Sequence, residues 1–169
     1  MVCDPFAEPL TTAHAGGGVF NGSDTNLPPL DPEAMTIMLN AINLGASPLD
    51  LMRAAMSAAR AVLPLTGQWK DEATVVISAA EAWAANPNEE NALTVSVARE
   101  ALIARHGGNW GNGDIATNNE FALMAVVAVA QTCGFQYAVK ALSLLALDCA
   151  GHAAGDDIDL APLVTAALL

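Results

Sequence analysis

The chain has 169 residues, of which 53% are hydrophobic and only 14% are charged, and its net charge is −12. That length fits one domain whose core needs no disulfide or metal to support it. Eighteen carboxylates against six cations repel phosphate groups, which argues against direct binding of nucleic acid.

The longest uncharged run, residues 121–139, approaches the length of a membrane span. It contains Gln131, Thr132, Gly134 and Gln136 and is rich in Ala rather than Leu. We therefore expect a buried central helix and no membrane association. The N-terminus lacks the pattern of a signal peptide, and the three cysteines form no close pair, so we expect reduced thiols in a cytoplasmic protein.

The apolar residues are mainly Ala, Leu and Val, while aromatic residues make up 5%. Ala has the best helix propensity, small side chains let helices approach closely, and no strand-like alternation of useful length occurs. The sequence predicts an all-α fold, an Ala-rich bundle of five to seven helices in residues 31–169. Residues 1–30 are rich in Gly, Pro and other turn-forming residues and predict an irregular N-terminal arm.

Four helices are expected before residue 107, each bounded by capping residues, Pro or Gly. They cover, in order, residues 32–44, 48–63, 71–85 and 89–106. Asp31 and Ser47 precede prolines at the first two starts, and Asn88 precedes the fourth helix. Helical spacing predicts buried faces, including Trp83 in the third helix. The members expected on the buried face of the fourth helix are Leu93, Val97, Ala101 and Ala104.

The second half begins with a Gly-rich segment, residues 107–114, around a single Trp110. Thr117 and Glu120 form a capping box, followed by a helix that is apolar nearly all round through residue 130. Gly134 either separates this helix from a sixth one, residues 135–150, or allows close packing inside one long helix. A turn and a short terminal helix, residues 160–169, complete the chain.

Two clusters were weighed as metal sites. Cys149 and His152 are spaced like metal ligands, with Cys133 and His106 as conceivable further ligands, but a structural zinc site needs two close pairs. Three acids in the turn, Asp156, Asp157 and Asp159, resemble half of a calcium loop without its closing Glu. No nucleophile elbow or phosphate loop is present. We therefore expect no catalytic residue, no metal and no cofactor.

Charge and tryptophan placement favour a protein-binding role. Residues 1–52 and 141–169 contain acids but no Lys or Arg, so both ends would attract a basic partner. The alternative is that the acidity only maintains solubility. Trp69 and Trp110 lie in connections, where an aromatic side chain either seals the end of a bundle or anchors a partner.

Three segments resemble a family pattern: residues 58–65 (AARAVLPL), 79–84 (AAEAWA) and 98–101 (AREA). Together they are similar to a helical family of immunity proteins attached to bacterial toxin systems. The resemblance covers about residues 47–105. It implies an Ala-rich bundle that neutralises a toxin by binding rather than by catalysis, and it supplies no functional residues.

The leading hypothesis is a non-enzymatic acidic protein that neutralises or occludes a basic partner, such as a toxin or a nucleic-acid-handling enzyme, as an immunity protein or phage-type inhibitor. The residues expected to bind this partner are Trp69, Trp110, Asp114, Asp156, Asp157 and Asp159. A second hypothesis is a helical enzyme or small-ligand carrier with a pocket near Trp110, His106 and Asp114. A third is a self-associating structural protein, a homo-oligomer paired through residues 121–139.

Overall fold

The computed structural model describes residues 31–107 and 117–169, except for the side chain of Gln136. The predicted arm, residues 1–30, and the segment that carries Trp110 and Asp114 lie outside the described residues.

Within the described ranges the fold is all-α, as the sequence predicts, with seven α-helices, two 3₁₀ segments and no strand. The elements are α1 (Pro32–Asn43), α2 (Pro48–Ala61), η1 (Leu63–Trp69), α3 (Lys70–Ala85), α4 (Glu89–His106), α5 (Asn118–Thr132), η2 (Gln136–Ala138), α6 (Val139–Ala154) and α7 (Ala161–Leu168).

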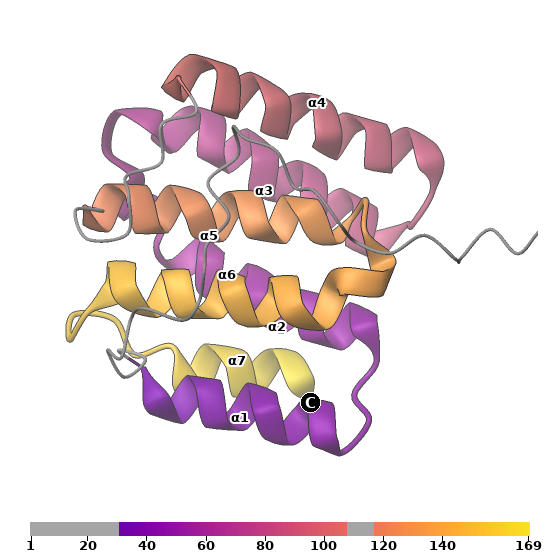
Figure 1. Ribbon diagram of the computed structural model, residues 1–169, viewed down its shortest axis with the longest axis vertical. Coiled ribbons are helices and arrows are strands. Elements are labelled where there is room, and N and C mark those ends of the chain that lie inside the picture. Colours follow the sequence, from indigo (N-terminus) through magenta and orange to yellow (C-terminus); the bar gives the residue numbers. More distant parts are fainter. Residues whose placement is uncertain (1–30, 108–116) are drawn as a thin grey trace, which may run out of the picture.

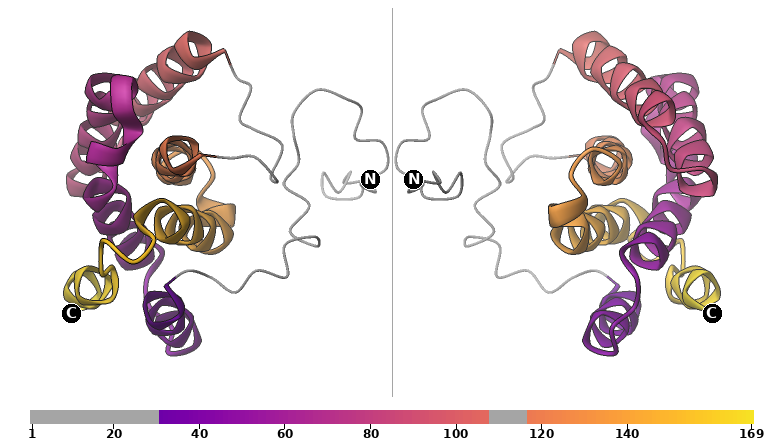
Figure 2. Two further views of the ribbon diagram at one scale, coloured as in Figure 1. Left: turned by 90° about the vertical axis from the view of Figure 1, so that its left-hand side faces the viewer. Right: turned by 90° about the vertical axis from the view of Figure 1, so that its right-hand side faces the viewer.

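Successive helices run in opposite directions, so α1, α3, α5 and α7 begin at the same end of the molecule (Figure 1). This end also receives the C-termini of α2, α4 and α6. The side views show α2, α3 and α4 forming an arc on one side, with α5 and α6 against its inner face (Figure 2). The first and last helices, α1 and α7, lie side by side along one edge.

Side-chain caps begin several helices where the sequence predicts them. The backbone N–H of Ala34 donates to Asp31, that of Asp50 to Ser47, and that of Asn91 to Asn88. Thr117 and Glu120 form the complete capping box at the start of α5. These bonds satisfy N–H groups that the first helical turn leaves without intrahelical partners.

The core is built mainly from α2, α5 and α6. The apolar stripe of α2 is buried as predicted, with Met52, Met56 and Ala59 at most 5% exposed. Trp83 of α3 is 7% exposed and belongs to the same core, which confirms its expected place. Many of the buried side chains are Ala, so the helices pack closely.

Three sequence expectations need correction. The face expected to be buried on α4 is exposed, and Val95 and Leu102 face the core instead. Gly134 does not mediate close packing, because a Cβ at this position would meet only Gln131 O at 3.9 Å. It lies in the break between α5 and α6, and the sixth helix covers residues 139–154 rather than 135–150.

The 121–139 run is divided among α5, η2 and the first residue of α6. Among the helices described, none has the length and apolar character that crossing a bilayer requires.

Candidate functional site

The arginines are neutralised within the fold. All four lie close to a carboxylate: Arg53 to Asp50 at 3.5 Å, Arg60 to Glu81 at 2.6 Å, Arg99 to Glu100 at 2.5 Å and Arg105 to Glu72 at 2.6 Å. Each guanidinium therefore offers little positive charge to an anionic partner. The carboxylates that take no part in such pairs set the sign of the surface field.

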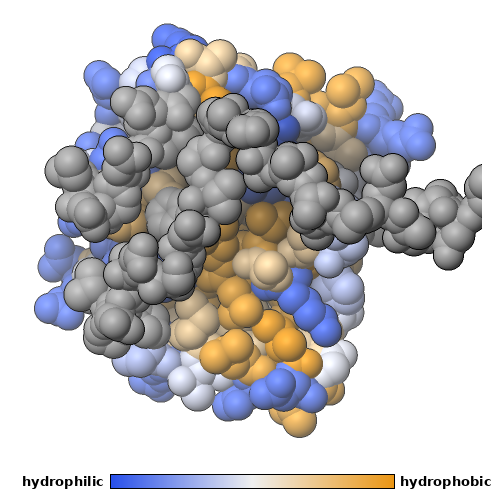
Figure 3. Space-filling view, in the orientation of Figure 1, coloured by the Kyte–Doolittle hydropathy of each residue, from blue (hydrophilic) through white to orange (hydrophobic). Residues whose placement is uncertain are grey.

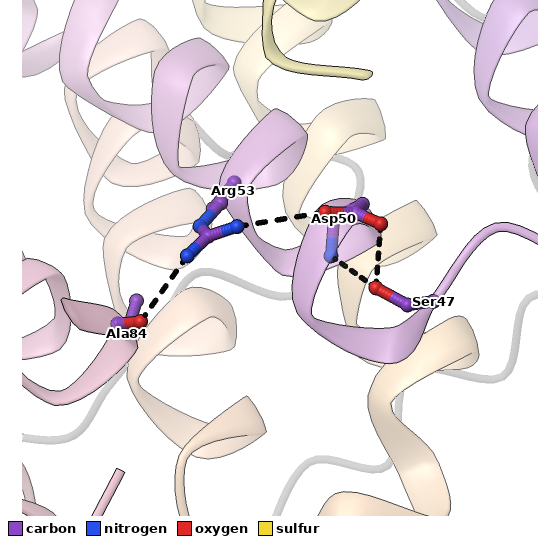
Figure 4. A network of polar contacts seen from close by, with 4 residues as sticks. All are labelled: Ser47, Asp50, Arg53 and Ala84. Carbon is purple, nitrogen blue, oxygen red and sulfur yellow. Dashed lines mark hydrogen bonds and ion pairs between the residues drawn. The ribbon is translucent and has the colours of Figure 1, made fainter. Parts of the chain in front are cut away.

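Figure 4 shows how one of these acids is used internally. The hydroxyl of Ser47 donates to Asp50 at 2.6 Å, and Arg53 lies against the same carboxylate. Arg53 also donates to the backbone oxygen of Ala84, at the end of α3, at 3.5 Å. Asp50 thus joins the start of α2 to α3 and is not a free surface acid, although it lies in the cation-free first part of the sequence.

Tertiary structure brings the two cation-free ends of the sequence together. Asp31 makes the link: one carboxylate oxygen accepts from Ala34 N–H at 2.9 Å and caps α1, and the other accepts from Leu160 N–H at 3.0 Å. The close approach of α6 supports this junction, since a Cβ on Gly151 would lie 3.5 Å from the Asp31 nitrogen. The starts of α1 and α7 are therefore held side by side.

Four exposed acids surround this junction, which we call the acidic edge: Glu33, Asp156, Asp157 and Asp159. Asp159 also accepts from Ala161 N–H at 3.1 Å, which leaves its second oxygen available. Neither α1, α7 nor the turn before α7 contains Lys or Arg. Because helix N-termini favour negative charge, these carboxylates remain ionised at little cost.

A hollow of about 380 Å³ lies between α1 and α7 at the acidic edge. Its lining combines two carboxylates with mainly apolar walls, from Glu33, Ile37, Asp159, Ala161, Pro162, Thr165, Ala166 and Leu169. The space-filling view also shows hydrophobic residues in the lower half of the face, where α6 and α1 lie, with hydrophilic residues along the border (Figure 3). Apolar walls beneath carboxylates suit the stem and head of a Lys or Arg side chain.

Trp69 and the acidic turn lie at the same end of the bundle, where α3 and α7 begin (Figure 1). Trp69 is half-buried, packs against the core and meets the ring of His106 with centroids 5.4 Å apart. This packing closes the bundle between α3 and α4, one of the two roles that the sequence left open. The other tryptophan of that pair, Trp110, and Asp114 are outside the described residues.

A second hollow of about 420 Å³ opens beside Trp69, close to the place expected for a ligand pocket. It is predominantly polar and is lined by Gln68, Trp69, His106, Thr117, Asn119, Glu120 and Leu123. Thr117 and Glu120 are also the capping box of α5, so part of this lining has a structural task.

The Cys and His side chains weighed as ligands are used in packing. Burial raises the pKa of the Cys133 and Cys149 thiols to about 12, and His152 stacks on Phe121 with ring centroids 4.8 Å apart. His152 also lies 3.8 Å from Asp148. Within residues 31–107 and 117–169, no three His, Cys, Asp or Glu side chains are grouped as a metal site requires.

Sequence reasoning identified the acidic turn but missed Glu33 and the hollow beside it. Glu33 follows a helix-starting proline, where an acid has a sufficient structural explanation. The available signal was that the first and last helices both lack cations, but only their adjacency turns two weak charge patterns into one surface.

Comparisons of the chain with family models, curated proteins and solved structures found no match. The functional argument therefore depends on the geometry and charge of the chain itself.

Proposed function

We propose that this chain is a non-enzymatic acidic binding protein that occludes a basic surface of another protein, as an immunity protein or a phage-type inhibitor does. The observation that carries the proposal is the acidic edge, four exposed carboxylates around one hollow, on a protein whose arginines are all paired internally. The family resemblance of residues 47–105 points to the same class. A cytoplasmic location is part of the proposal, since Cys133 and Cys149 are free, buried thiols.

The recognised group would be a Lys or Arg side chain at the functional surface of a toxin or a nucleic-acid-handling enzyme. Its aliphatic stem would pack against Ile37 and Pro162, and its charged head would meet Glu33 and Asp159. Asp156 and Asp157 would extend the negative field and increase the association rate.

The test is capture of partners from a lysate of the native host at about 50 mM NaCl, a concentration at which charge screening is weak. We expect a basic protein whose binding weakens steeply as salt is raised. Neutralising the acidic edge with Glu33→Gln, Asp156→Asn, Asp157→Asn and Asp159→Asn should weaken binding of that protein at least about tenfold, since buried or converging charge pairs contribute 2 kcal/mol or more.

The matched control removes the same charge elsewhere, with Asp71→Asn, Glu89→Gln, Glu90→Gln and Glu100→Gln on α3 and α4. This variant should keep most of the affinity. The proposal is wrong if no salt-sensitive basic partner is recovered, or if both quadruple variants lose binding equally. In the second case only net charge matters, and the acidic edge is not the site.

The second candidate function, a small-ligand carrier or enzyme, is favoured by the polar hollow beside Trp69. Its test is a screen of small polar metabolites by tryptophan fluorescence and thermal shift. A ligand that stabilises the wild-type chain but not Asn119→Leu would support it. No stabilising ligand at millimolar concentration would exclude a carrier with useful affinity.

A further inference from the structure

Helix α4 carries an exposed apolar stripe on the side opposite the core. Leu93 is 65% exposed and Val97 is 61% exposed, and Ala101 and Ala104 are exposed as well. At about 100° per residue these four positions fall within one sector of roughly 80°. The helix lies at the upper edge of the molecule and packs chiefly on α3 (Figure 1). A surface helix normally places polar residues on this side, so the stripe indicates a missing partner.

We propose that the stripe binds a second copy of this chain, with the two α4 helices antiparallel across a two-fold axis near residues 98–99. The size of the side chains supports this occupant. In that register Leu93 faces Ala104 of the second copy and Val97 faces its Ala101, so each large side chain meets a small one. Both halves of the contact are the same surface, as a two-fold dimer requires.

The charges along α4 have the matching asymmetry. Its N-terminal turn carries Glu89 and Glu90, and its last turn carries Arg105. Antiparallel pairing places Arg105 on the same side as Glu90 of the second copy, about one turn away along the axis. Glu100 lies near the two-fold axis beside its own equivalent, but Arg99 pairs with it at 2.5 Å and reduces that repulsion.

The other place considered for self-association is less suitable. Residues 121–139 were expected to pair between subunits, but Leu123, Val126 and Val129 of α5 are fully buried in their own chain. The α4 stripe needs no rearrangement to become a contact.

The dimer should be weak, because α4 has 18 residues and is about 27 Å long. One helix pair covers less than the ~800 Å² per partner of a standard interface. We expect a dissociation constant on the order of 10–100 µM. Two copies that each carry a charge of −12 repel one another, so added salt should strengthen the dimer. Salt has the opposite effect on the proposed basic partner, which keeps the two proposals experimentally separate.

Sedimentation velocity of the full chain from about 5 to 500 µM, at about 0.15 and 0.5 M NaCl, tests the association over the expected range. Leu93→Lys should weaken dimerisation at least about tenfold, because it places a charge at the centre of a desolvated contact. The matched control is Leu39→Lys on α1, an exposed leucine at the opposite edge of the molecule, and it should change the constant less than twofold. Thermal unfolding of each variant verifies that it is folded.

Cysteine cross-linking in a Cys3→Ser background tests the register. A mixture of Leu93→Cys and Ala104→Cys chains should form disulfide-linked heterodimers under mild oxidation. Leu93→Cys alone should not, because the antiparallel register separates its two copies by about 16 Å along the helix.

A wild-type chain that stays monomeric at 500 µM would overturn the proposal, as would a dimer that Leu93→Lys leaves intact. Efficient cross-linking of Leu93→Cys with itself would exclude the antiparallel register. If Leu93→Lys instead weakens capture of the basic partner while the wild type is monomeric, the stripe belongs to the partner interface and the dimer is excluded.

Discussion

Asp31 is the residue that most directly connects the ends of the chain. It caps α1 and accepts the N–H of Leu160, a residue with no exposed surface. Replacing it removes a helix cap and leaves a buried donor without its acceptor. Both effects are measurable in the free energy of unfolding.

We expect Asp31→Ala to lower the free energy of unfolding by about 2–4 kcal/mol, the sum of a cap and a buried N–H. Urea denaturation measures this loss. Ser47→Ala removes only an exposed cap and should cost about 1 kcal/mol, so it is the matched control. Equal losses in the two variants would show that the bond to Leu160 contributes nothing.

The buried thiols predict a pH dependence at the residue scale. Burial raises the pKa of Cys133 and Cys149 from 9.0 to about 12, so the native state keeps protons that the unfolded state releases above pH 9. Stability is therefore unaffected by these groups below about pH 9 and falls as pH rises from 9 towards 12. The limiting slope is about 1.4 kcal/mol per thiol per pH unit.

Denaturant titrations at pH 8 and pH 10 measure that fall. In Cys133→Ala/Cys149→Ala, the difference between the two pH values should shrink, although truncation itself lowers stability at both. An unchanged difference would assign the alkaline loss to other groups, such as the exposed Tyr137.

At the scale of elements, the connection between α2 and α3 depends on Gly67. Its φ of 62° and ψ of −129° lie in a region that other residues rarely adopt, and a Cβ there would be 2.8 Å from the side-chain nitrogen of Asn119. The position thus requires glycine for its backbone conformation and for the approach of α5.

Gly67→Ala should destabilise the fold by about 2–4 kcal/mol, since backbone strain of ~1–3 kcal/mol adds to a steric clash. Gly134→Ala is the matched control, because Gly134 lacks a positive φ and has open space around it, and it should be within about 0.5 kcal/mol of wild type. Thermal or urea unfolding measures both. Repeating Gly67→Ala in Asn119→Ala separates the two causes: the remaining loss is backbone strain.

At the scale of the whole molecule, the net charge of −12 opposes the compact state. Raising NaCl from about 0.02 to 0.5 M shortens the Debye length from roughly 20 Å to about 4 Å. We expect the melting temperature to rise by several degrees, equivalent to about 1 kcal/mol. Differential scanning calorimetry measures the change.

The quadruple amide variant of the acidic edge should show a smaller salt effect, since it has a third less net negative charge. A melting temperature that falls with salt in the wild type would mean that the arginine pairs on the surface outweigh the repulsion between acids.

The sequence by itself determined the elements. Caps and breakers such as Asp31, Asn88 and Gly107 act within a few residues of the helix ends they form, so local sequence is enough to place those ends. The all-α class, the core position of Trp83 and the start of α5 at Thr117 follow from the same short-range physics.

Only the tertiary structure decided which faces meet. Helix α4 has apolar residues on two sides, so periodicity could not show that Val95 and Leu102 face the core while Leu93 and Val97 remain outside. The acidic edge likewise depends on a bond between Asp31 and Leu160, which are 129 positions apart. Pairings at such separations are set by the packing of the whole bundle, which no local pattern encodes.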